Sequence, residues 1–131
     1  MREEILQELS VRKEEISDRV RDELKIIDRS FIKDLKIRKA RRPEGYDDIA
    51  ALIDHTILKP EASISDVKRV AEEAKKYRFA TVCVNSSNVK IVAEALEGSE
   101  VLPISVVGFP LGAMDYVSKA FEAVYAVKNG A

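Results

Sequence analysis

The sequence has 131 residues, of which 46% are hydrophobic and 34% charged, and its formal net charge is −1. This balance is typical of a soluble chain with one core, and it excludes a disordered protein and a strongly basic nucleic-acid binder. No apolar run approaches the about 20 residues that a membrane helix needs, and one cysteine with one histidine makes neither an internal disulfide nor a structural zinc site. We therefore expect a cytoplasmic protein with no nucleic-acid or membrane partner.

The first third of the sequence predicts a helical extension over residues 1–42. Apolar side chains recur at spacings of three, four and seven through residues 3–35, which places them in one stripe along a helix. Such a stripe needs an apolar partner. Packing on the following domain or on a second copy is the ordinary role of such a helix, and binding of a dedicated partner protein is the alternative. Arg42-Pro43-Glu44-Gly45 then predicts a linker over residues 43–47.

Residues 48–131 predict an α/β domain in which strands and helices alternate. A short helix over residues 47–52 leads into a strand at residues 53–58, and two further apolar runs predict strands at residues 80–84 and 101–109. Helical patterns follow each strand, the first opened by a capping box of Ser63 and Asp66 and the second capped by Ser86 or Ser87. This alternation favours βαβ units with about three parallel strands. The last helix is expected to bury Val117, Ala120, Phe121, Val124 and Val127.

Three motifs mark the strand ends of this domain. They read LIDHTILKP at residues 52–60, TVCVN at residues 81–85 and VVGFPLGA at residues 106–113. Together with Lys119, Glu122 and the closing Gly130-Ala131, they closely resemble the deoxyribose-phosphate aldolase family in order and spacing. The resemblance implies a partial TIM barrel, preceded by the helical extension. It also implies a class I aldolase that uses a lysine Schiff base and no metal or other cofactor. Such an enzyme cleaves 2-deoxyribose 5-phosphate to glyceraldehyde 3-phosphate and acetaldehyde.

The same resemblance implies which residues line a pocket for this small phosphosugar. They are Asp54 and Thr56 at the end of the first strand, Cys83 and Asn85 at the end of the second, and Gly108 and Phe109 at the mouth of the third. In the family, the Schiff-base lysine, the lysine that tunes it, the relay aspartate and the phosphate-binding residues lie on later strands. We therefore expect a truncated chain that holds no catalytic residue and is inactive by itself.

Several residues have more than one possible role. Asp54 either hydrogen-bonds substrate hydroxyls or shifts the pKa of a neighbouring lysine in a complete barrel, or it caps local backbone donors. His55 is expected on the opposite face of the strand, as a packed or hydrogen-bonded side chain. Cys83 is expected to be a small buried hydrophobe rather than a nucleophile. Neither Lys59 nor Lys119 is expected to form the Schiff base.

Two functions from different classes are compatible with these patterns. In the first, the chain is the N-terminal part of an aldolase. Its open sheet edges are then covered by a second copy, by the rest of the barrel or by the N-terminal helices, and we expect a homo-oligomer. In the second, the chain is a non-catalytic interaction module in which the N-terminal helix drives dimerisation and the open sheet edges take part. Deletion of residues 1–40 separates the two.

Overall fold

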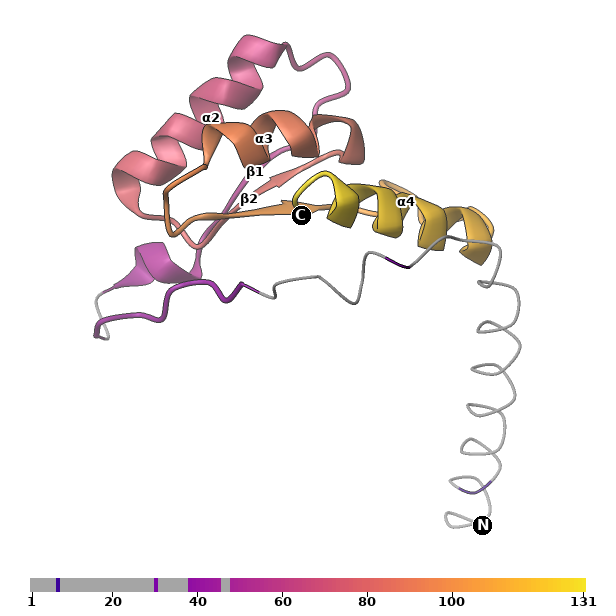
Figure 1. Cartoon of the computed structure of the whole chain (residues 1–131), viewed down its shortest axis with the longest axis horizontal. Helices are drawn as coiled ribbons and strands as arrows, with labels where there is room; N and C mark the ends of the chain where they lie inside the picture. The colour runs from indigo at the N-terminus through magenta and orange to yellow at the C-terminus, as the bar shows by residue number, and fades with distance from the viewer. Residues whose placement is uncertain (1–6, 8–29, 31–37, 46–47) are drawn as a thin grey trace.

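The computed structural model describes residues 7, 30, 38–45 and 48–131, and its centre is a sheet of three parallel strands (Figure 1). The strands are β1 (Asp54–Ile57), β2 (Thr81–Val84) and β3 (Leu102–Ser105), in the order β1-β2-β3. They alternate with helices α2 (Ile64–Tyr77), α3 (Val89–Ala95) and α4 (Tyr116–Lys128), and the 3-10 turns η3 (Ile49–Leu52) and η4 (Ser86–Asn88) precede β1 and α3. The predicted α/β fold with three parallel strands is confirmed. The predicted helix over residues 1–42 lies almost wholly outside the described residues, and residues 38–42 are not helical.

Helix α2 begins at the predicted capping box. The Ser63 hydroxyl accepts the Asp66 backbone N–H at 3.2 Å, and the Asp66 carboxylate accepts the Ser63 backbone N–H at 3.1 Å. Two of the free N–H groups at the start of the helix are thereby satisfied. The helix ends at Arg78, whose φ of 55° is left-handed and stops the helical repeat.

Two local predictions after β2 are wrong. Neither Ser86 nor Ser87 caps α3, because a 3-10 turn comes first and Asn88 occupies the N-cap position without a side-chain hydrogen bond. The third strand ends at Ser105 instead of Phe109. The Val106 N–H still donates to the Val84 carbonyl at 3.1 Å, but the chain then turns at Gly108, whose φ is 67°. A left-handed residue cannot continue a strand, so the sheet stops there.

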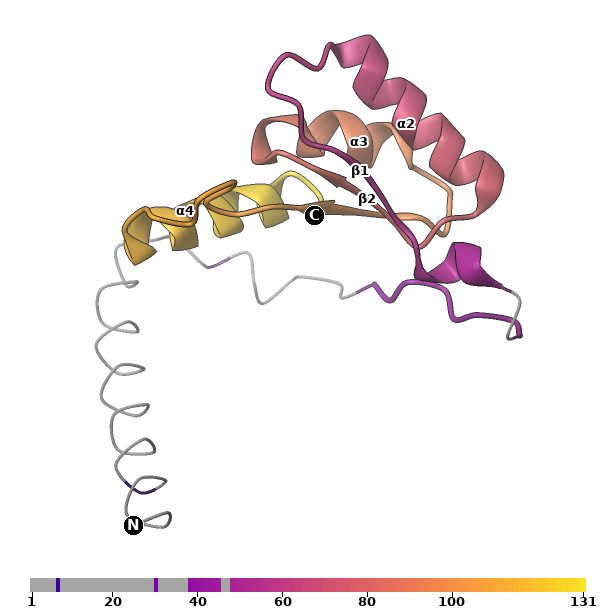
Figure 2. The same ribbon diagram turned by 180° about the vertical axis from the view of Figure 1, so that it is seen from behind.

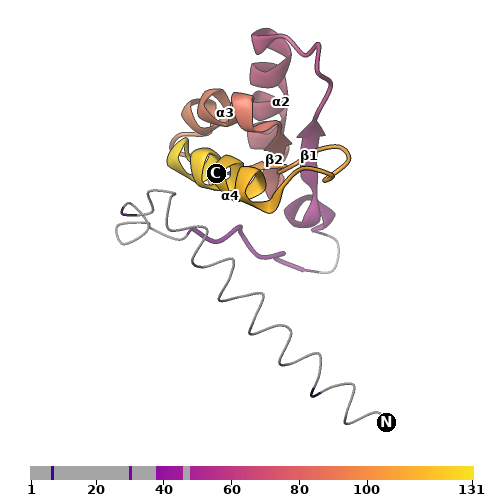
Figure 3. The same cartoon turned by 90° about the vertical axis from the view of Figure 1, so that its right-hand side faces the viewer.

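The sheet has one face covered by helices and one that no described helix covers (Figures 2 and 3). Val82 and Val84 point toward α2 and α3 and are fully buried. Each such side chain contributes about 1.5–3 kcal/mol of hydrophobic stabilisation. Side chains alternate along a strand, so the intervening positions form a second face, here called the inner face. The register of the strands assigns to it Asp54, Thr56, Thr81, Cys83, Leu102 and Ile104.

Helix α4 is less buried than its sequence pattern predicts. Ala126 is its one buried residue, whereas Phe121 is 61% exposed and Tyr125 is 52% exposed. The expectation that Phe121 is buried is therefore wrong. The helix packs along one side against η4, and the two exposed rings stand one turn apart on a side that no described element covers. In the described part of the chain, no helix is both long enough and apolar enough to span a membrane.

Residues 38–45 and Asp48, here called the strap, lie at the amino-terminal end of the sheet (Figure 1). Arg38 donates to the Ser99 carbonyl at 3.2 Å, in the loop before β3. Arg41 donates to the Arg78 carbonyl at 3.0 and 3.1 Å, in the loop before β2, and forms an ion pair with Asp48. Both anchoring loops precede strands, so the strap lies at the end of the sheet opposite the carboxyl ends of the strands.

Candidate functional site

The candidate site occupies the inner face of the sheet. Parallel pairing sets Asp54 beside Thr81 and Thr56 beside Cys83, so the four side chains form two neighbouring pairs. Leu102 and Ile104 continue the same face on β3. In parallel α/β folds, ligands bind at the carboxyl ends of the strands. The inner face therefore offers polar groups on β1 and β2 and an apolar wall on β3.

Asp54 lies deeper in this face than the sequence predicts. It is the first residue of β1 rather than the last, and Thr56 lies two positions further along, about 7 Å closer to the carboxyl end. The Thr81 hydroxyl donates to Asp54 Oδ1, while the Thr56 hydroxyl donates to the Asp54 backbone carbonyl at 2.9 Å. The Asp54 side chain thus has a threonine partner on the neighbouring strand. Sequence reasoning assigned no role to Thr81, although it stands two residues before Cys83 on the same face.

Cys83 is a free, half-buried cysteine between these polar groups. Burial raises the pKa of its thiol, the nearby charge of Asp54 raises that pKa further, and a hydrogen bond with Thr56 lowers it. The net shift is upward, so the thiol stays protonated at neutral pH. Because the thiolate is the reactive form, this environment favours a small packed side chain over a nucleophile.

Asn85 and Gly108 bring two loops to the carboxyl ends of the strands. Asn85 directly follows β2, and its Nδ2 donates to the Leu58 carbonyl at 3.3 Å, which links the ends of β2 and β1. The Gly108 N–H donates to Glu122 Oε2 at 2.8 Å, and the Ser86 hydroxyl donates to Glu122 Oε1 at 2.7 Å. Glu122 was visible in the sequence only as part of the resemblance. Its spacing of 14 residues from Gly108 gave no local signal of this contact.

Phe109 continues the loop beyond Gly108. Its ring is half exposed, as is the side chain of Met114, and Leu111 in the same loop is 85% exposed. The Phe109–Pro110 peptide bond is cis. The loop therefore presents apolar groups beside the polar ends of β1 and β2.

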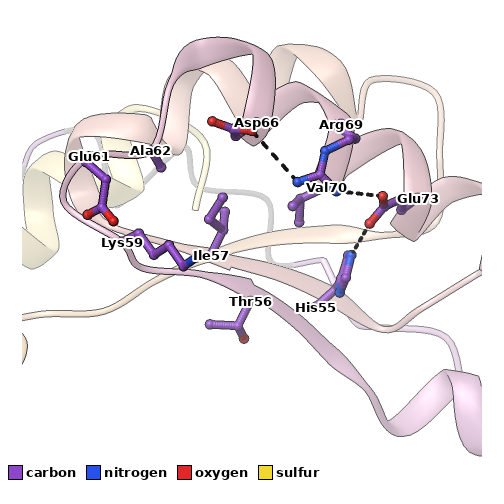
Figure 4. A pocket seen from close by; sticks show the side chains of 10 residues that line it. All are labelled: His55, Thr56, Ile57, Lys59, Glu61, Ala62, Asp66, Arg69, Val70 and Glu73. Carbon is purple, nitrogen blue, oxygen red and sulfur yellow. Dashed lines mark hydrogen bonds and ion pairs between the residues drawn. The ribbon is translucent and has the colours of Figure 1, made fainter.

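A separate pocket of about 430 Å³ opens on the helix-covered face, beside the free edge of β1 (Figure 4). His55 Nε2 lies 2.9 Å from Glu73 Oε2, and its ring centroid is 5.1 Å from that of Phe79. The hydrogen bond with His55, and then that with Arg69, lowers the pKa of Glu73. Figure 4 shows Thr56 on the other side of the strand from His55. The predicted packed and hydrogen-bonded role of His55 is confirmed.

The two lysines near the motifs lie away from the inner face. Lys59 is exposed and lines the pocket beside β1, and Lys119 Nζ donates to the Gly112 carbonyl at 3.2 Å. No strand position of β1, β2 or β3 is a lysine. Among residues 38–45 and 48–131, no three or more His, Cys, Asp or Glu side chains are grouped so that they could hold a metal ion.

Comparisons with known proteins place this geometry in context. No family model matches the chain. Curated relatives named deoxyribose-phosphate aldolase include one from Staphylococcus carnosus, 52% identical over 84 residues, covering 64% of this chain and 38% of the relative. One from Mycoplasma mobile is 58% identical over 80 residues, covering 61% and 37%. One from Thermotoga petrophila is 46% identical over 96 residues, covering 73% and 39%.

Solved structures agree with these relatives. A putative deoxyribose-phosphate aldolase from Coccidioides immitis has a TM-score of 0.64 and 37% identity, covering 70% of this chain and 36% of that chain. The deoxyribose phosphate aldolase from Aeropyrum pernix, which has a tetrameric structure, has a TM-score of 0.61 and 33% identity, covering 64% and 36%. The resemblance to deoxyribose-phosphate aldolases is confirmed. The chain spans less than two fifths of the length of the relatives it matches.

Proposed function

We propose that this chain forms the first three strand–helix units of a deoxyribose-phosphate aldolase. The whole barrel would reversibly cleave 2-deoxy-D-ribose 5-phosphate to glyceraldehyde 3-phosphate and acetaldehyde. The observation that carries the proposal is the inner face, where Asp54, Thr56 and Cys83 of the matching motifs stand together beside Asn85. In this proposal residues 48–131 are the barrel portion, residues 1–42 an extension and residues 43–47 the linker.

The described residues would bind and orient the substrate rather than attack it. The Asp54 carboxylate accepts hydrogen bonds, and the Thr56 hydroxyl and the Asn85 amide can donate and accept them, which suits the hydroxyl groups of a sugar. Their placement along β1 and directly after β2 would hold the carbonyl near the amine of a lysine. No described strand position carries a lysine. We therefore propose that the Schiff-base lysine belongs to a strand outside β1–β3.

Borohydride trapping tests this division of roles. The chain is incubated with 2-deoxyribose 5-phosphate and sodium borohydride, and its intact mass is measured. We expect the unmodified mass of 14.7 kDa. When the remaining length of the Staphylococcus carnosus relative is supplied as a second chain, we expect the adduct on that second chain together with retro-aldol activity. An adduct on this chain would overturn the proposed roles, and absence of activity from the pair would count against the aldolase function.

A second candidate function is that of an oligomerisation or interaction module. Two observations favour it: the exposed rings of Phe121 and Tyr125 on α4, and the edges of β1 and β3, which pair with no further strand among the described residues. Unpaired strand edges readily accept another strand. The tetrameric relative from Aeropyrum pernix supports a homo-oligomer of this chain.

Light scattering on a variant that lacks residues 1–40 separates the two sources of assembly. Loss of the oligomer with a folded remainder supports a module driven by the N-terminal segment. An unchanged oligomer assigns the contacts to the sheet edges and α4, as expected for part of a barrel.

A cytoplasmic location, where phosphorylated sugars are found, fits the aldolase proposal.

A further inference from the structure

The carboxylate of Glu122 joins two loops that are far apart in the sequence. Its Oε1 accepts the Ser86 hydroxyl at 2.7 Å, and its Oε2 accepts the Gly108 N–H at 2.8 Å. Ser86 directly follows Asn85 at the end of β2, and Gly108 directly precedes Phe109 beyond β3. One side chain of α4 therefore holds a hydroxyl next to Asn85 and a backbone amide next to Phe109.

The contact has the character of a charge-assisted clamp. The Gly108 N–H, and then the Ser86 hydroxyl, hold the pKa of Glu122 below its usual range. The carboxylate is therefore ionised at neutral pH, and hydrogen bonds to an ionised acceptor are roughly twice as strong as those between neutral groups. Glu122 is partly buried, which limits competition from water.

The loop that Glu122 holds has further contacts with α4 and within itself. A Cβ atom on Gly108 would lie 3.2 Å from Lys119 Cδ and 3.3 Å from Met114 Sδ, so only glycine fits there without displacement. Lys119 Nζ donates to the Gly112 carbonyl at 3.2 Å, and the Gly112 N–H donates to the Gly108 carbonyl at 2.6 Å. The turn from Gly108 to Gly112 is thus closed on itself and bonded to α4 at two points.

The three strand ends form one connected series. The Asn85 amide links β2 to the Leu58 carbonyl after β1, and Glu122 links the loop after β2 to the loop after β3. We propose that Glu122 is a positioning residue that sets Asn85 and Phe109 in place for the phosphosugar substrate. This inference rests on the aldolase function proposed above. In this role Glu122 would act through Asn85 and Phe109 and would not itself contact the substrate.

Nuclear magnetic resonance of the full 131-residue chain tests the clamp without any substrate. The Gly108 amide signal of the wild type should titrate at a pH below the ordinary glutamate range, since that amide reports the charge of its acceptor. In Glu122→Gln the titration should disappear, and hydrogen exchange at Gly108 should accelerate about tenfold or more. The matched control is Glu97→Gln, an exposed glutamate in the turn after α3, and it should leave both readings unchanged. An unchanged Gly108 titration in Glu122→Gln would overturn the clamp.

A milder variant and a ligand separate the positioning role from the proposed function. Ser86→Ala removes one hydroxyl, and it should move the Gly108 titration up toward the ordinary glutamate range while the fold stays intact. Addition of 2-deoxyribose 5-phosphate should shift the Asn85 and Gly108 amides of the wild type, and Glu122→Gln should weaken this binding several-fold. Equal binding by both proteins would overturn the positioning role. If the wild type shows no shifts, the substrate-binding role proposed above for the residues of this chain is overturned, while the substrate-free titration still decides the clamp.

Discussion

The hydroxyl of Thr81 donates to the carboxylate of Asp54 across the first paired position of β1 and β2. Thr81 is 8% exposed, whereas Asp54 is exposed on the inner face. The buried hydroxyl therefore has a charged acceptor, and the carboxylate keeps free lone pairs toward the pocket. This pairing fixes the side chain that lies deepest in the candidate site.

Replacing Thr81 by valine keeps the shape of the side chain and removes the hydroxyl. We expect Thr81→Val to lower the free energy of unfolding by about 1 kcal/mol, because one hydrogen bond to a solvent-accessible carboxylate is lost. Urea titration measures the change. The control is Thr56→Val, whose hydroxyl bonds the Asp54 backbone carbonyl and the Cys83 thiol but is exposed to solvent, so its removal should cost less. A larger loss in the control would contradict this ranking.

Gly108 and Gly112 form a matched pair for the loop after β3. Both have left-handed backbones, with φ of 67° and 64°, but an added Cβ meets side chains only at Gly108. Gly112→Ala should cost about 1–2 kcal/mol for the backbone conformation alone. Gly108→Ala should cost at least about 1 kcal/mol more, because Lys119 and Met114 must move. Thermal unfolding of the two variants measures the difference, and equal costs would show that the close contact adds no strain.

The pair of His55 and Glu73 predicts an acid-sensitive contribution to stability. The pKa of Glu73 in the folded chain lies below its ordinary value of 4.5, chiefly because of the hydrogen bond with His55. At pH values above this ordinary pKa, ionised Glu73 therefore stabilises the fold. This contribution is lost as the pH falls through the lower pKa that Glu73 has in the folded chain. We expect Glu73→Gln to be less stable than the wild type at pH 7 and the gap to narrow on acidification. Urea midpoints between pH 7 and the acid limit of folding measure this gap. Glu72→Gln, which alters a neighbouring exposed pair with Lys75, should show no such narrowing.

The hydrogen bonds of Arg41 predict that this side chain attaches the strap to the domain. Its guanidinium bonds both Asp48 oxygens and the Arg78 carbonyl, and lysine cannot reproduce that planar set of donors. We expect Arg41→Lys to speed hydrogen exchange across residues 38–45 and at Asp48, measured by mass spectrometry, with little change in β1–β3. Arg38→Lys alters a single exposed bond and is the control. Equal protection in both variants would mean that Asp48 and Arg78 do not hold the strap.

Local sequence signals predicted the elements that depend on neighbouring residues. Spacings of a few residues predict the capping box of Ser63 and Asp66 and the alternation of strands with helices. They also predict that His55 lies on the face of β1 opposite Asp54. The resemblance implied that Thr56 and Cys83 belong to one pocket, and the register of β1 and β2 places both on the inner face, while their role in binding stays a prediction.

Long-range contacts account for the errors. Ser86 bonds Glu122, 36 residues away, instead of capping α3. Phe121 follows a helical stripe, but the burial of a stripe depends on what packs against it, and no described element does so. The position of Asp54 at the start of β1 likewise depends on pairing with Thr81, 27 residues later.

The strap has a practical consequence for handling this protein. Arg38 and Arg41 fasten it to the loops before β3 and β2, at the end of the sheet away from Asn85 and Phe109. The strap itself therefore lies away from the mouth of the candidate pocket. A fluorescent label attached to the strap should leave that mouth open for ligand titrations, whereas one inserted in the loop at Leu111 would obstruct it.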